Sequence, residues 1–329
     1  MNIFSYTKDE YEYCLGILNL LKKGIKEQRS FPMMIEVQTF NRCNAKCPVC
    51  PYPYTTAKEE MMKIDDSLYR SLLKQMADEN DFMILVLSFQ NEPLVDGSLI
   101  EKAKMFKELM PKKQLHMVTN GSLLSKELAE KVYRYFDLVS ISVNAHDKKT
   151  YEEVMGGIKF ESISDNLDYI SSKPEWINKT ILRFIRQRAN FKEHNDFKKH
   201  WNKKGFRVFG FEINSRLGNV RDYENLRISD NLLRKADKAF MKAISGFILS
   251  SCPIPPMTFY IRANGDVVLC FNDWSNNHIM GNVAGKSIRE IFNSEFYSCV
   301  KSNAKSGMLP DENICNKCDL FKEKIFLTI

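Results

Sequence analysis

The sequence lacks any apolar run of about 18 residues or more, the length that a membrane-spanning helix requires. It also lacks a secretory signal, because acidic residues precede the short apolar run near the N-terminus and lysines follow it. No compact basic block is present, so nucleic acid is not an expected partner. These absences argue against a membrane span, export and nucleic-acid binding. We therefore expect a soluble, cytoplasmic protein.

The formal net charge of +7 is compatible with an anionic substrate such as a phosphorylated sugar. The lysines, however, are scattered along segments that have helical periodicity. This scatter favours a solvated surface over a charged binding patch.

Nine cysteines are a high number for a chain of 329 residues. Because the expected compartment is reducing, disulfides are a poor explanation for them. Metal or redox chemistry is favoured instead. The length allows one large domain and a smaller appendage.

Short apolar runs alternate with stretches of helical periodicity along most of the chain. The six runs cover residues 34–40, 83–89, 115–120, 138–144, 180–187 and 207–214. Continuous apolar runs suit strands that are covered on both faces. The alternation predicts an α/β fold with a parallel sheet and right-handed crossovers, either doubly wound or curled into a partial barrel. A helix is expected before the first strand, over 9–27, and another between the first two strands, with Asp65 or Asp66 as N-cap.

The pattern changes near residue 250. Residues 258–270 form two strand-like runs around an Asn-Gly turn, which predicts a hairpin. One short helix over 287–296 and a polar tail follow, with too little apolar material for a separate core. We expect a small, distinct unit that is stabilised by a metal. The predicted division is an N-terminal extension (1–32), a core domain (33–228), a bridging helix (229–249) and a metal-binding domain (250–329).

Three cysteines follow the first strand directly. Cys43, Cys47 and Cys50 have the spacing Cys-x3-Cys-x2-Cys, which places three thiolates on one loop. Thiolates bind iron-sulfur clusters and structural zinc, but a closed zinc site needs four ligands. The loop therefore leaves one coordination position open, where a small molecule can bind and be reduced.

This spacing at the end of a first strand resembles the signature of radical S-adenosylmethionine (radical SAM) enzymes. The resemblance implies a partial (β/α)6 barrel and a four-iron four-sulfur cluster on Cys43, Cys47 and Cys50. In that family the cluster chelates SAM and cleaves it reductively to a 5′-deoxyadenosyl radical, with electrons from a donor such as flavodoxin or ferredoxin. Val49 departs from the pattern, because many members carry an aromatic residue there.

The segment after the second strand, SFQNEPLVD, resembles the Gly-Gly-Glu-Pro segment of the same family, with Gln90 and Asn91 in place of the glycines. The resemblance implies that Glu92 contacts the amino group of SAM. A helix-capping loop is the alternative interpretation.

Polar residues also end the next two strands, at the edge where parallel sheets bind ligands. By resemblance, these residues face the ribose and methionine of SAM: Thr119, Asn120, Ser142 and Asn144. Equally, polar residues simply terminate strands. Met155 stands where many relatives have an arginine for the SAM carboxylate, which leaves Arg183 or Arg186 for that role.

Four further cysteines lie in the C-terminal unit: Cys252, Cys270, Cys315 and Cys318. Their pattern resembles the SPASM extension of radical SAM proteins and, more closely, its shortened twitch form. The resemblance implies one auxiliary four-iron four-sulfur cluster that is fully liganded by the protein. A zinc-ribbon site is the alternative. Cys14 and Cys299 are left over and suit buried apolar positions, although Cys299 is also a candidate hydrogen-atom donor.

A single auxiliary cluster with this cysteine layout resembles the arrangement in an aminoglycoside dehydrogenase and in related sugar or aminocyclitol epimerases. The leading hypothesis is radical oxidation, or epimerisation, of a carbohydrate-like alcohol, with the auxiliary cluster as electron acceptor. One alternative is modification of a ribosomally made peptide, which the short segment before the first strand disfavours. Another is a non-enzymatic zinc or iron-sulfur protein. The candidates for base or anion contacts are Arg216, His146 and Asp273.

Overall fold

The computed structural model describes residues 27, 29–228, 252–306 and 314–319. All six strands that the apolar runs predict are present. They are Met34–Val37 (β1), Ile84–Val86 (β2), Gln114–Thr119 (β3), Leu138–Ser142 (β4), Thr180–Arg186 (β5) and Arg207–Glu212 (β6). The expected helices at 9–27 and 229–249 lie outside the described residues.

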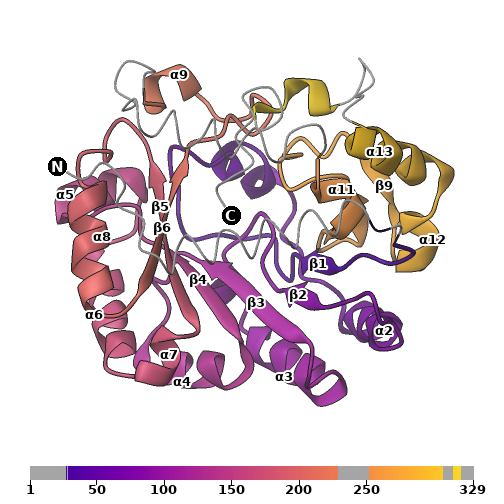
Figure 1. The fold of residues 1–329 in the computed structure, drawn as a ribbon, viewed down its shortest axis with the longest axis horizontal. Helices are drawn as coiled ribbons and strands as arrows, with labels where there is room; N and C mark the ends of the chain where they lie inside the picture. The colour runs from indigo at the N-terminus through magenta and orange to yellow at the C-terminus, as the bar shows by residue number, and fades with distance from the viewer. Residues whose placement is uncertain (1–26, 28, 229–251, 307–313, 320–329) are drawn as a thin grey trace.

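The six strands pair in parallel in the order β6-β5-β4-β3-β2-β1. Figure 1 shows them in an arc, with the larger helices on its outer side. These helices are Asp66–Ala77 (α2), Leu99–Leu109 (α3), Lys126–Tyr135 (α4), Phe160–Ser171 (α6) and His194–Lys203 (α8). A doubly wound sheet would carry helices on both faces. The curved sheet with helices on its outer side is the arrangement expected for a partial barrel.

Shorter elements complete the region up to residue 228. They are Tyr52–Tyr54 (η1), Thr56–Lys58 (η2), Pro93–Val95 (η3), Lys148–Val154 (α5), Pro174–Ile177 (α7) and Tyr223–Leu226 (α9). The expected cap of α2 is confirmed, because the Asp65 side chain accepts hydrogen bonds from the backbone N–H groups of Ser67 and Leu68, at 2.8 and 3.0 Å.

The two faces of the sheet have different chemistry. Alternate residues such as Ile35, Val37 and Leu182 are buried in one core against the outer helices. Because side chains alternate between the faces of a strand, Glu36 and Arg183 point to the inner, concave face. Buried apolar residues such as Ile181 and Phe209 lie on the same face as Arg183, so the inner face combines apolar cover with charged side chains.

The C-terminal segment extends the same sheet and does not stand apart from it. Thr258–Ile261 (β7) pairs in parallel with β1, and Asp266–Val268 (β8) and Ile279–Asn282 (β9) continue antiparallel to give nine strands. The hairpin is confirmed, with Gly265 in the left-handed region of its turn. Backbone hydrogen bonds join this segment to β1, so it shares the sheet of the preceding region. The domain boundaries themselves stay predictions.

The segments on either side of the hairpin contain more helix than the sequence predicts. Its elements are Ile254–Met257 (α11), Ile288–Phe292 (α12), Glu295–Ser306 (α13) and Ile314–Lys317 (η4). One helix was expected over 287–296, but the helix ends at Phe292 and a second begins at Glu295. Tyr297 explains the extension, since its ring is buried against Phe259 and its hydroxyl donates to the Thr258 carbonyl at 3.1 Å.

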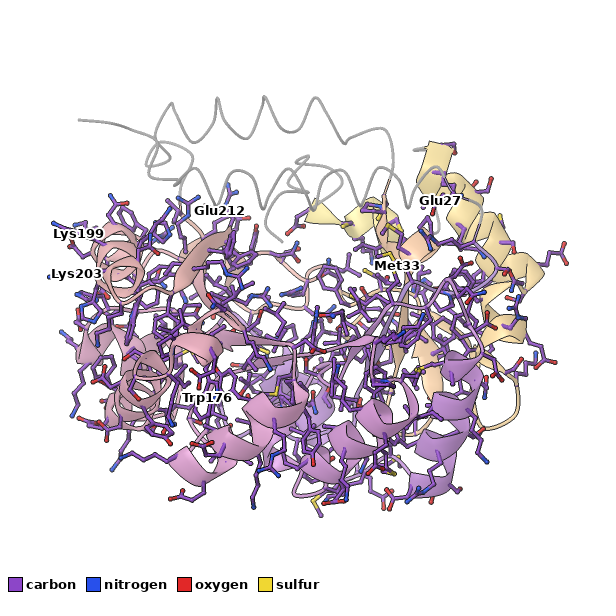
Figure 2. The ribbon with its side chains drawn as sticks, turned by 60° about the horizontal axis from the view of Figure 1, so that its bottom comes forward. Glu27, Met33, Trp176, Lys199, Lys203 and Glu212 are labelled. Atoms are coloured by element: carbon purple, nitrogen blue, oxygen red, sulfur yellow. The ribbon has the colours of Figure 1, made fainter. Side chains whose placement is uncertain are left out.

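The surface charge fits the scattered pattern of the sequence. Figure 2 shows Lys199 and Lys203 on α8 pointing outward at one edge of the molecule, and both are exposed. Within the described part of the chain, no helix is both long enough and apolar enough to span a membrane.

Candidate active site

The first three cysteines lie on a compact loop after β1. The Cys43 N–H donates to the Tyr52 hydroxyl at 2.8 Å, and the Cys50 N–H donates to the Cys47 carbonyl at 3.0 Å. The Ala45 N–H points at the Cys43 sulfur, at 3.4 Å. None of the three cysteines is in a disulfide, and all are half-buried. The loop therefore holds three thiols on one side of a short turn.

The thiol groups of this loop are close enough to influence one another's ionisation. Burial, together with the negative charges of Glu92 and Cys50, raises the pKa of Cys43 to about 12. Burial, followed by the charges of Cys50 and Cys43, raises the pKa of Cys47. Three converging thiolates are costly without a cation and are stabilised by one.

These donors fit a four-iron four-sulfur cluster, in which each cysteine binds a different iron. Among the described residues, no three His, Cys, Asp or Glu side chains are arranged around the position of a single metal ion. Three thiolates also leave one iron of such a cluster without a protein ligand, as the sequence predicts for SAM binding.

A glycine in the turn after α5 holds this loop in place. The Lys46 N–H donates to the Gly156 carbonyl at 2.7 Å, and Gly156 has a φ of 40°. A Cβ atom at position 156 would lie well inside van der Waals contact with the carbonyl oxygen of Lys46. Only glycine lets the two backbones approach this closely.

We expect Gly156→Ala to displace the cysteine loop and to lower the iron content of the first site. The cost should combine overpacking, about 1–3 kcal/mol, with left-handed backbone strain of about 1 kcal/mol. Gly157→Ala is the matched control, because its φ is 97° but its Cβ would meet nothing within 4 Å. Iron per chain and the unfolding temperature are the measurements. Equal losses of iron and of unfolding temperature in the two variants would contradict the role of Gly156 in holding the cysteine loop.

The segment after β2 forms hydrogen bonds that connect it to the strand end before the cysteine loop and to the C-terminal region. Asn91 accepts from the Phe89 N–H and donates to the Phe40 carbonyl, both at 2.8 Å. Gln90, at a φ of 52° where the family pattern has glycine, donates to the Asp273 carbonyl at 3.0 Å. Both residues therefore connect β2 to other parts of the site. Their contact with SAM stays a prediction.

Glu92, the next residue of this segment, is buried. Its carboxylate accepts from the Thr119 hydroxyl at 2.6 Å, the Asn120 N–H at 2.7 Å and the Leu94 N–H at 3.0 Å. Burial raises its pKa to about 7, against the lowering effect of these hydrogen bonds. Glu92 thus caps η3, as the alternative interpretation proposed, and joins the ends of β2 and β3. A contact with the amino group of SAM stays a prediction.

The other predicted SAM contacts divide into two groups. Thr119 and Asn120 lie beside the cysteine loop, because the Asn120 side chain donates to Asn44 at 2.8 Å. Asn144 is buried with a φ of 61°, and it accepts from the Ile185 N–H at 2.7 Å while its amide points at the Met155 sulfur. These roles remain predictions. The last member, Ser142, ends β4 and is half-buried.

Two of the weak catalytic candidates lie on the outer side of the molecule. The His146 ring lies 5.5 Å from that of His200, an exposed residue of α8. Cys299 is exposed on α13, where its sulfur accepts from Asn303. The prediction of a buried Cys299 is therefore wrong.

Asp273, another weak candidate, is buried in the loop after β8. Its carboxylate accepts from the N–H groups of Asn277 and His278, at 3.3 and 3.0 Å. These bonds close the loop and give the carboxylate a structural role.

The second set of cysteines comes together from three parts of the chain. Burial raises the pKa of Cys270 far above its usual value, and the charges of Cys318, Cys252 and Cys315 raise it further. The Cys252 N–H donates to the Ala304 carbonyl at 2.8 Å, and the Cys318 N–H donates to the Cys315 carbonyl at 3.1 Å. Four converging thiols can close a site, as an auxiliary cluster requires.

Arg216 lies between the two sets of cysteines. Burial lowers its pKa, and the negative charges of Cys50, Cys270 and Cys318 oppose that effect. Its guanidinium donates to the Asn272 side chain at 2.7 Å and lies over the Phe271 ring. One guanidinium is therefore within electrostatic range of both sites.

Packing also joins the loop that carries Arg216 to both sites. Val49, beside Cys50, packs against Ile213 and Val220. Ser215 donates through its N–H and its hydroxyl to the Asp319 carboxylate, both at 2.6 Å. The segment after β6 thus bridges the first cysteine loop and the C-terminal cysteines.

Two charged residues face the inner side of the sheet below this bridge. Burial raises the pKa of Glu36 to about 8, while the positive charges of Arg183 and Arg216 lower it. Burial lowers the pKa of Arg183 to about 10. Arg186, the other candidate on β5, forms an ion pair with Glu212. The sequence analysis missed Glu36, whose only signal is a carboxylate inside an apolar strand.

Comparison with known proteins agrees with this geometry. Residues 37–173 match the Radical SAM superfamily, and residues 252–319 match SPASM, an iron-sulfur cluster-binding domain. The chain is 21% identical over 286 residues to the S-adenosyl-L-methionine-dependent 2-deoxy-scyllo-inosamine dehydrogenase of Niallia circulans, which covers 87% of this chain and 92% of that protein.

Two solved structures share the fold. BtrN in complex with AdoMet and 2-DOIA is 18% identical with a TM-score of 0.55, over 88% of this chain and 91% of that one. Streptococcus suis SuiB bound to the precursor peptide SuiA is 16% identical with a TM-score of 0.67, over 98% of this chain and 79% of that one. The chain therefore belongs to the radical SAM superfamily, as an oxidoreductase-like enzyme that uses SAM and a four-iron four-sulfur cluster and that carries a C-terminal SPASM domain.

Proposed function

We propose that this enzyme oxidises an alcohol group of a carbohydrate-like or aminocyclitol-like small molecule to a ketone. When bound, the cofactors supply a radical that removes a hydrogen atom from a substrate carbon, and a one-electron acceptor at the second site. The protein must then hold the substrate within reach of both sites. It must also take up the proton of the hydroxyl group.

The position of Arg216 is the observation that carries this proposal. Its guanidinium donates to the Asn272 side chain, two residues after Cys270, at 2.7 Å, and it is close enough to Cys50 and Cys318 for their negative charges to raise its pKa. A substrate that contacts Arg216 is therefore near both sites. Proximity to a second redox site favours loss of an electron from the substrate over return of a hydrogen atom. Dehydrogenation follows more directly from this arrangement than epimerisation, because the one thiol considered as a hydrogen donor, Cys299, is exposed on α13.

The named relative supports the same reaction class, since it is a dehydrogenase of an aminocyclitol. A second candidate function is modification of a ribosomally made peptide. The fold likeness to SuiB, a protein solved with a precursor peptide, favours that candidate. The two functions differ in the product that follows SAM cleavage.

Product analysis tests the proposal. The reconstituted enzyme is incubated anaerobically with SAM and dithionite, together with 2-deoxy-scyllo-inosamine and a panel of other polyols. We expect one equivalent of ketone for each 5′-deoxyadenosine, identified by mass spectrometry after trapping with a hydrazine. Deoxyadenosine formation with no ketone from any polyol would count against the proposal. A cross-linked or epimerised peptide as the product would establish the second candidate.

A further inference from the structure

We infer that Arg183, Arg216 and Glu36 form the substrate site on the inner face of the sheet, where the arginines bind an anionic group of the substrate and Glu36 accepts its hydroxyl proton. This inference rests on the proposed function and adds a substrate class to it. The anionic group is a carboxylate or a phosphate on a sugar-like molecule.

The sheet register fixes two of these residues on the inner face. Glu36 pairs with Tyr260 of β7, and both neighbours of Glu36 in β1, Ile35 and Val37, are buried against the outer helices. Arg183 alternates in the same way with Leu182, which faces the outer core. Side chains at alternate positions of a strand point to opposite faces. Glu36 and Arg183 therefore both point to the inner face of the curved sheet. Each of the two side chains affects the pKa of the other.

Arg183 differs from the other arginine of its strand. Arg186 forms an ion pair with Glu212, but no carboxylate among the described residues forms an ion pair with Arg183, whose guanidinium lies 4.6 Å from the centre of the Phe211 ring. Cysteine charges act on Arg216 but do not affect the pKa of Arg183. Arg183 thus lies over the Phe211 ring with no ion-pair partner in the described part of the chain, and its guanidinium is available to an anionic group of the substrate.

The balance of charge determines the class of ligand. The Arg183 and Arg216 guanidinium groups are close enough to the Glu36 carboxylate to lower its pKa, and that carboxylate has no hydrogen bond or ion pair within the described part of the chain. Guanidinium binds carboxylate and phosphate through paired hydrogen bonds. A cationic amine would be repelled by the same two groups. We therefore expect this enzyme to prefer an acidic or phosphorylated sugar over an aminocyclitol.

Glu36 completes the chemistry of alcohol oxidation. After the carbon has lost its hydrogen atom, the O–H bond breaks and the proton moves to the Glu36 carboxylate. The O–H electron pair stays on the oxygen, one electron leaves to the acceptor at the second site, and the C=O bond forms. A pKa of about 8 suits this role, because a base works best when its pKa is near the working pH. The charged or titratable groups that face Glu36 are Arg183, Arg216 and Tyr260.

Equilibrium binding to the holoenzyme with SAM tests the arginine site. The probes are D-glucuronate, D-glucose 6-phosphate, neutral D-glucose and cationic 2-deoxy-scyllo-inosamine. We expect at least one of the two acidic probes to bind about tenfold or more tightly than glucose, since hydrogen bonds to charged groups contribute on this scale. The two acidic probes distinguish a carboxylate from a phosphate. Equal binding of acidic and neutral probes would overturn the inference.

Variants separate this site from general effects of charge. Arg183→Gln should weaken binding of the preferred acidic probe by about tenfold or more, and Arg183→Lys should retain part of the affinity. Arg70→Gln is the matched control, because Arg70 is exposed on α2. Wild-type iron content verifies that each variant is folded. Unchanged affinity in folded Arg183→Gln would contradict the assignment.

The role of Glu36 has its own readout. Ketone formation should rise with pH through about 8, where the carboxylate becomes ionised, and Glu36→Gln should lose both this rise and most of the ketone while it still forms deoxyadenosine. A Glu36→Gln variant with the wild-type pH profile would overturn the base assignment. If no polyol is oxidised at all, the proposed function fails, whereas the binding experiment still decides the anion site.

Discussion

Alanine at Cys43, Cys47 or Cys50 should abolish cleavage of SAM. Each of these thiols is expected to bind a different iron of the first cluster, so the loss of one breaks the site. Iron should fall by about four atoms per chain, and deoxyadenosine should fall to the level of a reaction without enzyme. The effect should be the same at all three positions, because they share one loop after β1. Deoxyadenosine is measured by chromatography after anaerobic incubation with SAM and dithionite.

Cys299→Ala is the matched control for this experiment, because it also replaces a cysteine but at an exposed position of α13. It should keep wild-type iron and wild-type SAM cleavage. Substantial deoxyadenosine from folded Cys47→Ala would contradict the assignment of the first site.

Alanine at Cys270 should separate SAM cleavage from product formation. Cys270 follows β8 and interacts electrostatically with the other three cysteines of its set. Its loss should remove about four irons per chain and leave the substrate without an electron acceptor. We therefore expect deoxyadenosine to form while the ketone falls to background.

The stability of the C-terminal region should fall in the same variant. Val267, Val268 and Leu269 are fully buried next to Cys270, so loss of the cluster exposes this end of the sheet. The unfolding temperature of the anaerobic holoenzyme measures the effect, with Cys299→Ala again as the control. Cys270→Ala with undiminished ketone would show that the second set is not the acceptor.

Local sequence patterns predicted the parts of the structure that depend on neighbouring residues. The six parallel strands follow from short apolar runs, and the cysteine loop follows from the spacing of Cys43, Cys47 and Cys50. The hairpin follows from Asn264 and Gly265, which suit a tight turn. Strand β9 was missed, because the sequence IMGN has little of the alternation that indicates a strand.

Contacts between segments that are far apart in the sequence could not be predicted from local sequence patterns. The pairing of β1 with β7 has no local signal, so the C-terminal region was expected to stand apart. Arg216 was a candidate only because it follows a strand, and its place between two sets of cysteines comes from the fold. Glu36 was missed because its strand reads as an apolar run, and its carboxylate acquires a role only when Arg183 is brought to the same face.

Because the sheet is continuous, the backbone pairing between β1 and β7 determines how far apart the two sets of cysteines lie. Four residue pairs, from Met34 with Thr258 to Val37 with Ile261, set the register between β1 and β7. A slip of one residue would turn every side chain of the strand to the other face, so this register is strongly specified. The spacing between the two sets of cysteines is thus set by the scaffold, and under the proposed function this spacing fixes the distance over which the electron is transferred. Side chains of the concave face can diverge to accept new substrates without changing the spacing between the two sets of cysteines.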